Sequence, residues 1–142
     1  MRRSFKFIPY MMITTTNTQA PHVSASAATP APPSEMARSF ARVCLLEECI
    51  RACEQFADFL GGESSRLQSE LSECISACAA LNGATARQST YATQYALLCD
   101  TVCRNTVSAC RPIDSPHARF VEVLCRAVIN MVEDDFGMAM AN

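Results

Sequence analysis

The chain has 142 residues, of which 49% are apolar and 18% are charged, and these values suit one compact helical domain with a buried core. The formal net charge is −2, and from Glu35 onward 14 acidic residues face 9 basic ones, so the clustered Lys and Arg of a nucleic-acid-binding protein are absent. The longest uncharged apolar stretch is also far shorter than the roughly 20 residues of a membrane span.

Residues 1–33 differ in composition from the rest of the chain, because they are rich in Thr, Ala, Ser and Pro and keep no regular period. The sequence predicts a disordered tail or an export leader here. The start, MRRSFKF, resembles a twin-arginine export signal, and Ala25-Ser26-Ala27 offers the small residues of a cleavage site. A functional leader would export the protein to the periplasm, whereas a tail without a targeting signal would leave it in the cytoplasm.

Residues 34–142 are predicted to form an all-α domain, an antiparallel up-down four-helix bundle with short connections. Ser34 is the expected N-cap of the first helix, and a Gly or Pro follows the end of each of the first three. The first three expected ranges are Glu35–Leu60, Ser65–Leu81 and Ala86–Cys110. The fourth helix opens with Ser115 as N-cap and Pro116 at the first helical position, and the final DDFGMAMAN is expected to fray.

Nine cysteines carry the most informative pattern, because six of them form three CxxxC motifs, CIRAC, CISAC and CDTVC. Residues four apart in a helix lie on the same face, so each motif directs two thiols the same way. The cysteines expected to face a shared interior are Cys49, Cys53, Cys74, Cys78, Cys99, Cys103, Cys110 and Cys125. In the first helix the inward stripe is predicted to run through Val43, Leu46, Ile50, Cys53, Ala57 and Leu60, with Cys49 on its flank and Cys44 left undecided.

Buried thiols at these positions have two interpretations. A free cysteine packs like a small apolar side chain, so core packing alone stays open as an alternative. Metal binding explains three pairs at identical spacing better, because thiolates are soft ligands that select Cu(I) and also bind zinc. Cu(I) accepts few ligands, so one CxxxC pair can hold one ion, whereas zinc needs two pairs to meet across helices. The pattern therefore favours several Cu(I) ions over one zinc ion.

Other kinds of site lack the residues that they need. The chain has no CxxC, which argues against zinc ribbons, thioredoxin-like redox sites and ferredoxin-type clusters. His22 and His117 are its only histidines, and it has no H-E-x-x-H, no Glu-x-x-His and no Gly-rich phosphate loop. We therefore expect no enzymatic activity. A disulfide-stapled bundle, or a non-metal bundle acting as a structural or interaction module, stays as the alternative.

From roughly Arg38 to Val132 the chain resembles the copper storage family of cysteine-lined four-helix bundles, and CIRAC, CISAC, LCDTVC and Cys110 carry the resemblance. The resemblance implies that CxxxC pairs project into the core and bind many Cu(I) ions. It implies a ligand role for the six CxxxC cysteines, with Cys110 and Cys125 matched less closely. Family members often extend the motif to CxxxCxxC, but here Phe56, Leu81 and Thr106 occupy the third position, so we expect a reduced capacity.

The expected partners are copper ions, with zinc less favoured, and neither nucleic acid nor a membrane. His117, at the start of the fourth helix, and Met131, Met138 and Met140, toward its end, are candidate soft ligands at the two mouths of the bundle. A solvated histidine, a core methionine and methionines in a tail explain them better than a ligand role does. The sequence leaves open whether the chain forms a homo-oligomer and which protein donates or accepts copper.

Overall fold

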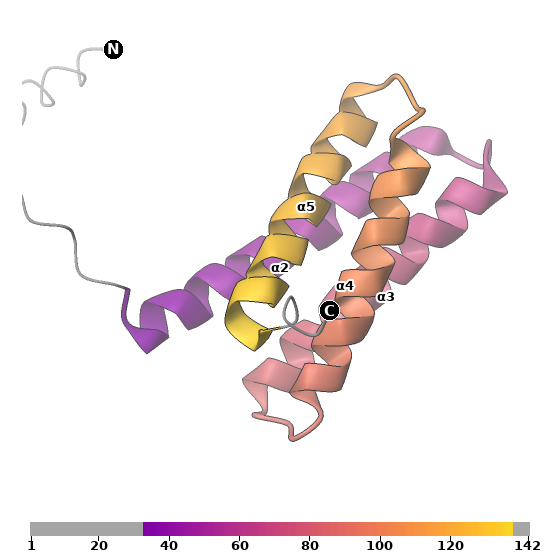
Figure 1. Cartoon of the computed structure of the whole chain (residues 1–142). Helices are drawn as coiled ribbons and strands as arrows, with labels where there is room; N and C mark the ends of the chain where they lie inside the picture. Colours follow the sequence, from indigo (N-terminus) through magenta and orange to yellow (C-terminus); the bar gives the residue numbers. More distant parts are fainter. Residues whose placement is uncertain (1–32, 138–142) are drawn as a thin grey trace, which may run out of the picture. The chain divides into compact units, whose positions relative to one another are not determined.

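The computed structural model describes residues 33–137, and these residues form an all-α bundle. Its helices are α2 (Glu35–Leu60), α3 (Ser65–Ala86), α4 (Ala92–Cys110) and α5 (Pro116–Phe136). Each helix packs against the next one along the chain, and α2 also packs against α5, which closes the ring of four (Figure 1). The predicted up-down four-helix bundle is confirmed. Nowhere in residues 33–137 is a helix both long and apolar enough to cross a membrane.

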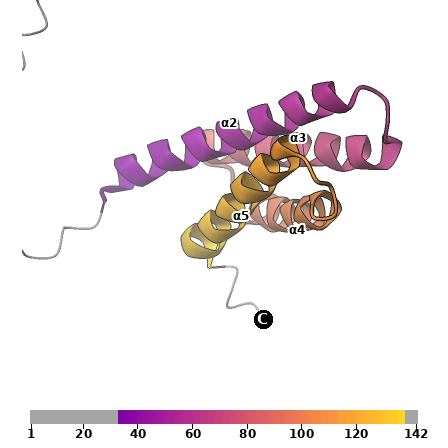
Figure 2. The same cartoon turned by 90° about the horizontal axis from the view of Figure 1, so that it is seen from above.

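Several expectations fall outside this range. The predicted tail or leader, with its twin-arginine-like start and with His22, lies outside the described residues, as do Met138 and Met140. The N-terminal turns of α2 extend past the C-terminal end of α5, as Figure 1 and Figure 2 both show. Met36 and Phe40, which lie on these turns, are accordingly 79% and 70% exposed.

The helix starts follow from side-chain caps that the sequence predicts. The Oγ of Ser34 accepts a hydrogen bond from the backbone N–H of Ala37 at 3.1 Å, and Ser115 caps α5 with Pro116 at the next position. Gly61 ends α2 with a φ of 63°, in the left-handed region where a side chain would cost energy. α2 therefore has the predicted bounds, Glu35–Leu60.

The connection between α3 and α4 differs from the prediction. Gly83 was expected to stop the helix near Leu81, but α3 continues to Ala86 and buries Ala84 completely. The chain turns instead at Gln88, whose φ is 53°, and the N–H of Ser89 bonds back to the carbonyl of Ala84 at 2.8 Å. α4 consequently begins at Ala92 rather than Ala86. The gain from the added backbone hydrogen bonds and the burial of Ala84 outweighs the modest helix penalty of a glycine.

α5 also runs further than the sequence suggested. Part of the segment expected to fray is helical, because α5 ends at Phe136 and Gly137 caps it in the left-handed conformation with a φ of 63°. Arg42 of α2 pairs with Asp135 at 2.9 Å, and its guanidinium lies 6.0 Å from the centre of the Phe136 ring. These contacts with α2 hold the last turn of α5 in place.

The core confirms three of the four predicted stripes and corrects the first. α2 buries Leu46, Cys49, Ala52, Cys53 and Phe56, whereas Ile50, Ala57 and Leu60 are only partly buried. The true inward face of α2 is thus rotated from the predicted one, because α2 must cover α3 on one side and α5 on the other. The predicted inward residues that the structure buries fully on α3, α4 and α5 are Leu71, Cys74, Cys78, Leu81, Ala96, Cys99, Cys103, Thr106, Cys110, Val121, Cys125, Val128 and Val132.

Candidate metal centre

The bundle interior is lined with sulfur. Eight of the nine cysteines are fully buried, and all nine are free thiols. The buried ones are Cys49 and Cys53 on α2, Cys74 and Cys78 on α3, Cys99, Cys103 and Cys110 on α4, and Cys125 on α5. The predicted inward direction of these eight side chains is confirmed. Cys44, which the sequence left undecided, is exposed on α2.

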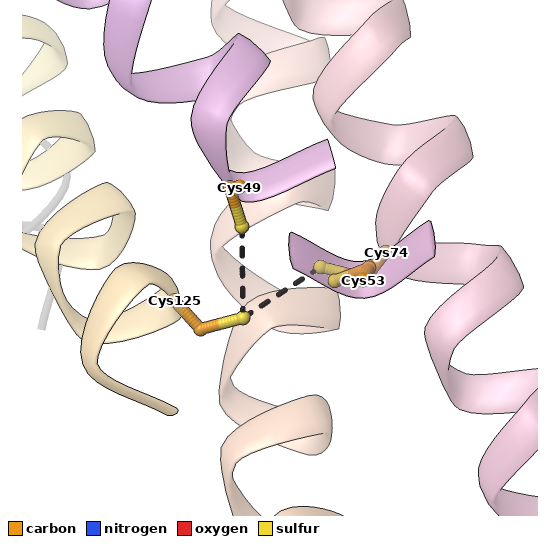
Figure 3. Close-up of side chains that lie close together, drawn as sticks. All are labelled: Cys49, Cys53, Cys74 and Cys125. Carbon is orange, nitrogen blue, oxygen red and sulfur yellow. Dashed lines mark hydrogen bonds between the residues drawn. The ribbon is translucent and has the colours of Figure 1, made fainter. Parts of the chain in front are cut away.

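A four-sulfur group occupies the middle of the bundle. The Sγ of Cys125 lies 3.8 Å from that of Cys49 and 3.7 Å from that of Cys74 (Figure 3). Together with Cys53, these sulfurs all lie within 4.8 Å of one another. α3 and α5 are not among the closely packed helix pairs, so the contact between Cys74 and Cys125 crosses the centre of the bundle. Three helices thus supply one compact set of soft ligands.

A second group shares Cys74 with the first. The sulfurs of Cys74, Cys78 and Cys103 lie within 4.8 Å of one another, and the Cys74–Cys103 distance is 3.9 Å. Cys78 also lies 3.8 Å from Cys99, which belongs to neither group. We call this connected set the sulfur network. Its members are Cys49, Cys53, Cys74, Cys78, Cys99, Cys103 and Cys125.

Cys110 faces the same interior but lies apart from the sulfur network. It is the last residue of α4, and none of the sulfur contacts within hydrogen-bonding distance in residues 33–137 involves it. Its backbone carbonyl accepts a hydrogen bond from the guanidinium of Arg119 at 2.7 Å. This bond supplies a donor to one of the last carbonyls of α4, which have no partner within the helix. Thr106, one turn earlier on the same face, fills the space toward Cys103 and is fully buried.

The surroundings of the thiols are apolar, which sets their acid–base behaviour. Burial raises the pKa of Cys110 to about 11, because an apolar environment disfavours the thiolate. Within the sulfur network, hydrogen bonds from Cys103 and Cys125 hold the pKa of Cys74 below its usual range. The Cys103 thiol donates hydrogen bonds to Cys125, Cys49 and Cys74, and these bonds raise its pKa because they are lost with its proton. Shared protons thus join the thiols of the network, and a soft cation that binds there would displace these protons.

The comparison with known protein families decides between packing and metal binding. The family model described as copper storage protein matches residues 33–134. The chain belongs to the copper storage protein family. Comparisons with curated proteins and with solved structures gave no significant match. Copper storage proteins bind Cu(I) through cysteines and are not enzymes, so this chain stores Cu(I) with its buried cysteine clusters. The predicted family, function, metal and lack of catalysis are confirmed.

The third positions of the three motifs show how this copper storage protein departs from the CxxxCxxC pattern. Phe56, Leu81 and Thr106 are all fully buried, so the backbone directs each position inward and only the side chain lacks a thiol. Of the three residues, Thr106 differs least in size from the cysteine of the CxxxCxxC pattern. Its hydroxyl donates a hydrogen bond to the carbonyl of Val102 at 2.9 Å. A cysteine there would fill nearly the same volume between Cys103 and Cys110.

We expect Thr106→Cys to raise the copper capacity, because the new sulfur would connect Cys110 to the sulfur network. The substitution loses one hydrogen bond and exchanges a methyl and a hydroxyl for one sulfur, so a stability change of about 1 kcal/mol is expected. Anaerobic Cu(I) titration of the variant beside the wild type measures the gain. Leu97→Cys adds a thiol on the exposed face of α4 and serves as the control. Equal gains for both variants would contradict the inward placement.

The candidate ligands at the bundle mouths remain predictions. The His117 ring stacks on that of Phe59, with 4.4 Å between the ring centroids, and on that of Phe56, with 6.0 Å between them. The imidazole therefore lies against two aromatic rings rather than against a sulfur. Its Nδ1 is buried, and it has no hydrogen-bond partner among the described residues. Met131 is partly buried and packs against the apolar core. No described contact joins either side chain to the sulfur network.

Sequence reasoning missed two features of the centre. It placed Cys49 on the flank of α2, whereas the structure brings this thiol to the four-sulfur group. It also gave no sign that Cys110 would stand apart from the others. Cys49, Ala52 and Phe56 are three and four residues apart, but the predicted stripe has the same helical spacing, so the spacing alone favoured neither face.

Proposed function

We propose that the seven cysteines of the sulfur network hold the stored copper and that Cys110 contributes a peripheral ligand at most. The observation that carries this assignment is the set of sulfur contacts between helices in a fully buried core. Cys44 is exposed and lies outside the proposed site. The copper-binding domain is proposed to be residues 34–142, which the family match over residues 33–134 and the division of chain contacts after Pro33 both support.

The distances between the sulfurs suit shared ions. A zinc–thiolate bond is about 2.3 Å long, so two sulfurs on one ion of similar size lie up to roughly 4.6 Å apart when the ligands are collinear and closer when the angle bends. The contacts of 3.7–3.9 Å in the network fall within this reach. Ions can therefore enter between the thiols with small side-chain movements and no change of helix packing.

Charge balance supports several ions rather than one. A single Cu(I) between two thiolates leaves one net negative charge in an apolar core, where an uncompensated charge is costly. Thiolates that bridge two ions bring the numbers of Cu(I) ions and thiolates closer to equality, and the net charge closer to zero. The short distances within the four-sulfur group allow such bridging. We therefore propose that the capacity approaches one ion per network thiol.

Zinc is the second candidate, and the four-sulfur group is the observation that favours it. Four thiols around one centre match the tetrahedral Cys₄ arrangement of structural zinc sites. Such a site would use Cys49, Cys53, Cys74 and Cys125 and would leave three network thiols without a role. Addition of excess Cu(I) to zinc-loaded protein separates the two candidates, because displacement of the zinc followed by further copper uptake supports copper storage.

Titration of the reduced protein with Cu(I) under anaerobic conditions, in competition with a chromogenic chelator, tests the proposal. We expect several ions per chain to be withheld from the chelator, because buried thiolates bind Cu(I) strongly. The same protein with its thiols alkylated after unfolding is the control and should withhold none. A stoichiometry of zero or one for the reduced protein would rule out storage by the sulfur network.

A further inference from the structure

One pair of thiols differs in position from the rest of the sulfur network. Cys78 and Cys99 lie 3.8 Å apart, on α3 and α4, and both are fully buried. Cys78 is one turn beyond Cys74 on α3, and Cys99 is one turn before Cys103 on α4, so the pair lies at the edge of the network nearest the α3–α4 connection. Cys99 belongs to neither compact sulfur group, and its sulfur contact within hydrogen-bonding distance among the described residues is with Cys78.

We infer that the protein also reduces cupric ion, with Cys78 and Cys99 as the pair of thiols that supplies the electrons. The inference rests on the copper-binding role proposed above. Two Cu²⁺ ions each gain one electron, and the two thiols lose two electrons and two protons and form one disulfide bond. The protons pass to solvent, and both Cu⁺ ions are bound by thiols that stay reduced. Cupric ion is the oxidant, so no further reactant is needed.

Geometry favours this pair over the other contacts. An S–S bond is about 2.05 Å long, so the sulfurs must approach by roughly 1.8 Å, and they belong to helices that already pack directly together. Oxidation of Cys49 with Cys125 would instead remove half of the four-sulfur group. Oxidation of Cys74 with Cys103 would break both groups, because Cys74 belongs to each of them. Oxidation of the edge pair leaves the four-sulfur group intact and removes only Cys78 from the second group, so it harms copper binding least.

The thiols that remain drive the reaction forward. Five network cysteines stay reduced when the edge pair is oxidised, namely Cys49, Cys53, Cys74, Cys103 and Cys125. They bind the Cu⁺ produced and so lower its free concentration, which pulls the reduction toward completion by mass action. The chain would thus accept copper in either oxidation state and convert Cu²⁺ into the form that it stores.

Anaerobic addition of two equivalents of CuCl₂ to the fully reduced, reductant-free protein tests the inference. We expect the electron paramagnetic resonance signal of Cu(II) to disappear and the thiol count, measured after unfolding in acid with a copper chelator, to fall from nine to seven. The disulfide should join the tryptic peptides Leu67–Arg87 and Gln88–Arg104. Since each peptide holds two cysteines, fragmentation in the mass spectrometer must place the bond at Cys78 and Cys99.

Two variants make the test specific. Cys78→Ala with Cys99→Ala should slow the loss of the Cu(II) signal about tenfold or more, because no edge pair remains. Cys44→Ala removes the exposed thiol outside the sulfur network and should keep both the reduction and the Cys78–Cys99 disulfide. Persistent Cu(II) in the wild type, or a disulfide at other cysteines, would overturn the inference. A parallel Cu(I) titration of each protein shows separately whether storage itself is intact.

Discussion

Replacing Cys74 and Cys125 together with alanine should remove more than half of the copper capacity and leave the four-helix bundle folded. These two residues take part in three of the four close sulfur contacts, and Cys74 belongs to both compact groups. Their loss leaves one of the four close contacts, the one between Cys78 and Cys99. Because alanine keeps the core apolar and leaves only a small cavity, the cost in stability should be about 1–2 kcal/mol per site.

Cys78→Ala with Cys99→Ala is the matched control, because it removes the same number of thiols from the edge of the network. This variant keeps the four-sulfur group and loses one close contact, so it should retain more than half of the capacity. Chelator competition measures the capacity of both variants, and far-ultraviolet circular dichroism checks their helix content. Equal losses of copper capacity in the two variants would show that the thiols bind copper independently and that Cys74 and Cys125 have no special part in the network.

Copper loading should raise the melting temperature by tens of degrees. The network draws its thiols from all four helices, so ions bound as proposed would link segments that separate on unfolding. Each site filled at 100 times its dissociation constant adds about 2.7 kcal/mol to the free energy of unfolding, less whatever binding the unfolded chain keeps. For a domain of this size, 1 kcal/mol corresponds to roughly 4–8 °C. Single CxxxC pairs stay close in the unfolded chain, so the gain comes mainly from contacts between helices.

Thermal unfolding of the apo and Cu(I)-loaded protein under anaerobic conditions measures this rise, and removal of copper by a strong chelator should reverse it. The Cys74→Ala, Cys125→Ala protein provides the comparison, since it loses the sulfur contacts of α5 and keeps those of Cys78 on α3 with α4. We expect copper to raise its melting temperature much less than that of the wild type. An unchanged melting temperature in the loaded wild type would mean that copper binds outside the bundle core.

Local signals in the sequence predicted much of the fold. The helix ends are capped as predicted at Ser34, Gly61 and Ser115-Pro116. Capping depends only on residues within one turn, so the local sequence is enough to predict it. The 3.6-residue period of apolar positions gave the inward faces of α3, α4 and α5, including the direction of their cysteines. The spacing of the CxxxC pairs was enough to predict a thiol-lined core and a soft metal.

Features that depend on how helices rotate and slide against each other were not predictable from these signals. The face of α2 is set by α3 and α5 together, so the predicted stripe was right at Leu46 and Cys53 but wrong in taking Ile50, Ala57 and Leu60 as the rest of the inward face. Gly83 stays helical because Ala84 is buried one residue later. The contact between Cys74 and Cys125, and the separation of Cys110 from the other sulfurs, depend on the axial offset between helices, which no single-helix pattern encodes.

The exposed thiol of Cys44 gives this protein a built-in attachment point. It lies on α2 little more than one turn before Cys49, while every other cysteine is shielded by the core. A maleimide fluorophore should therefore couple to the folded chain at this single position and leave the buried ligands untouched. Emission from such a conjugate, quenched as metal accumulates nearby, would turn the storage bundle into an optical sensor of its own filling.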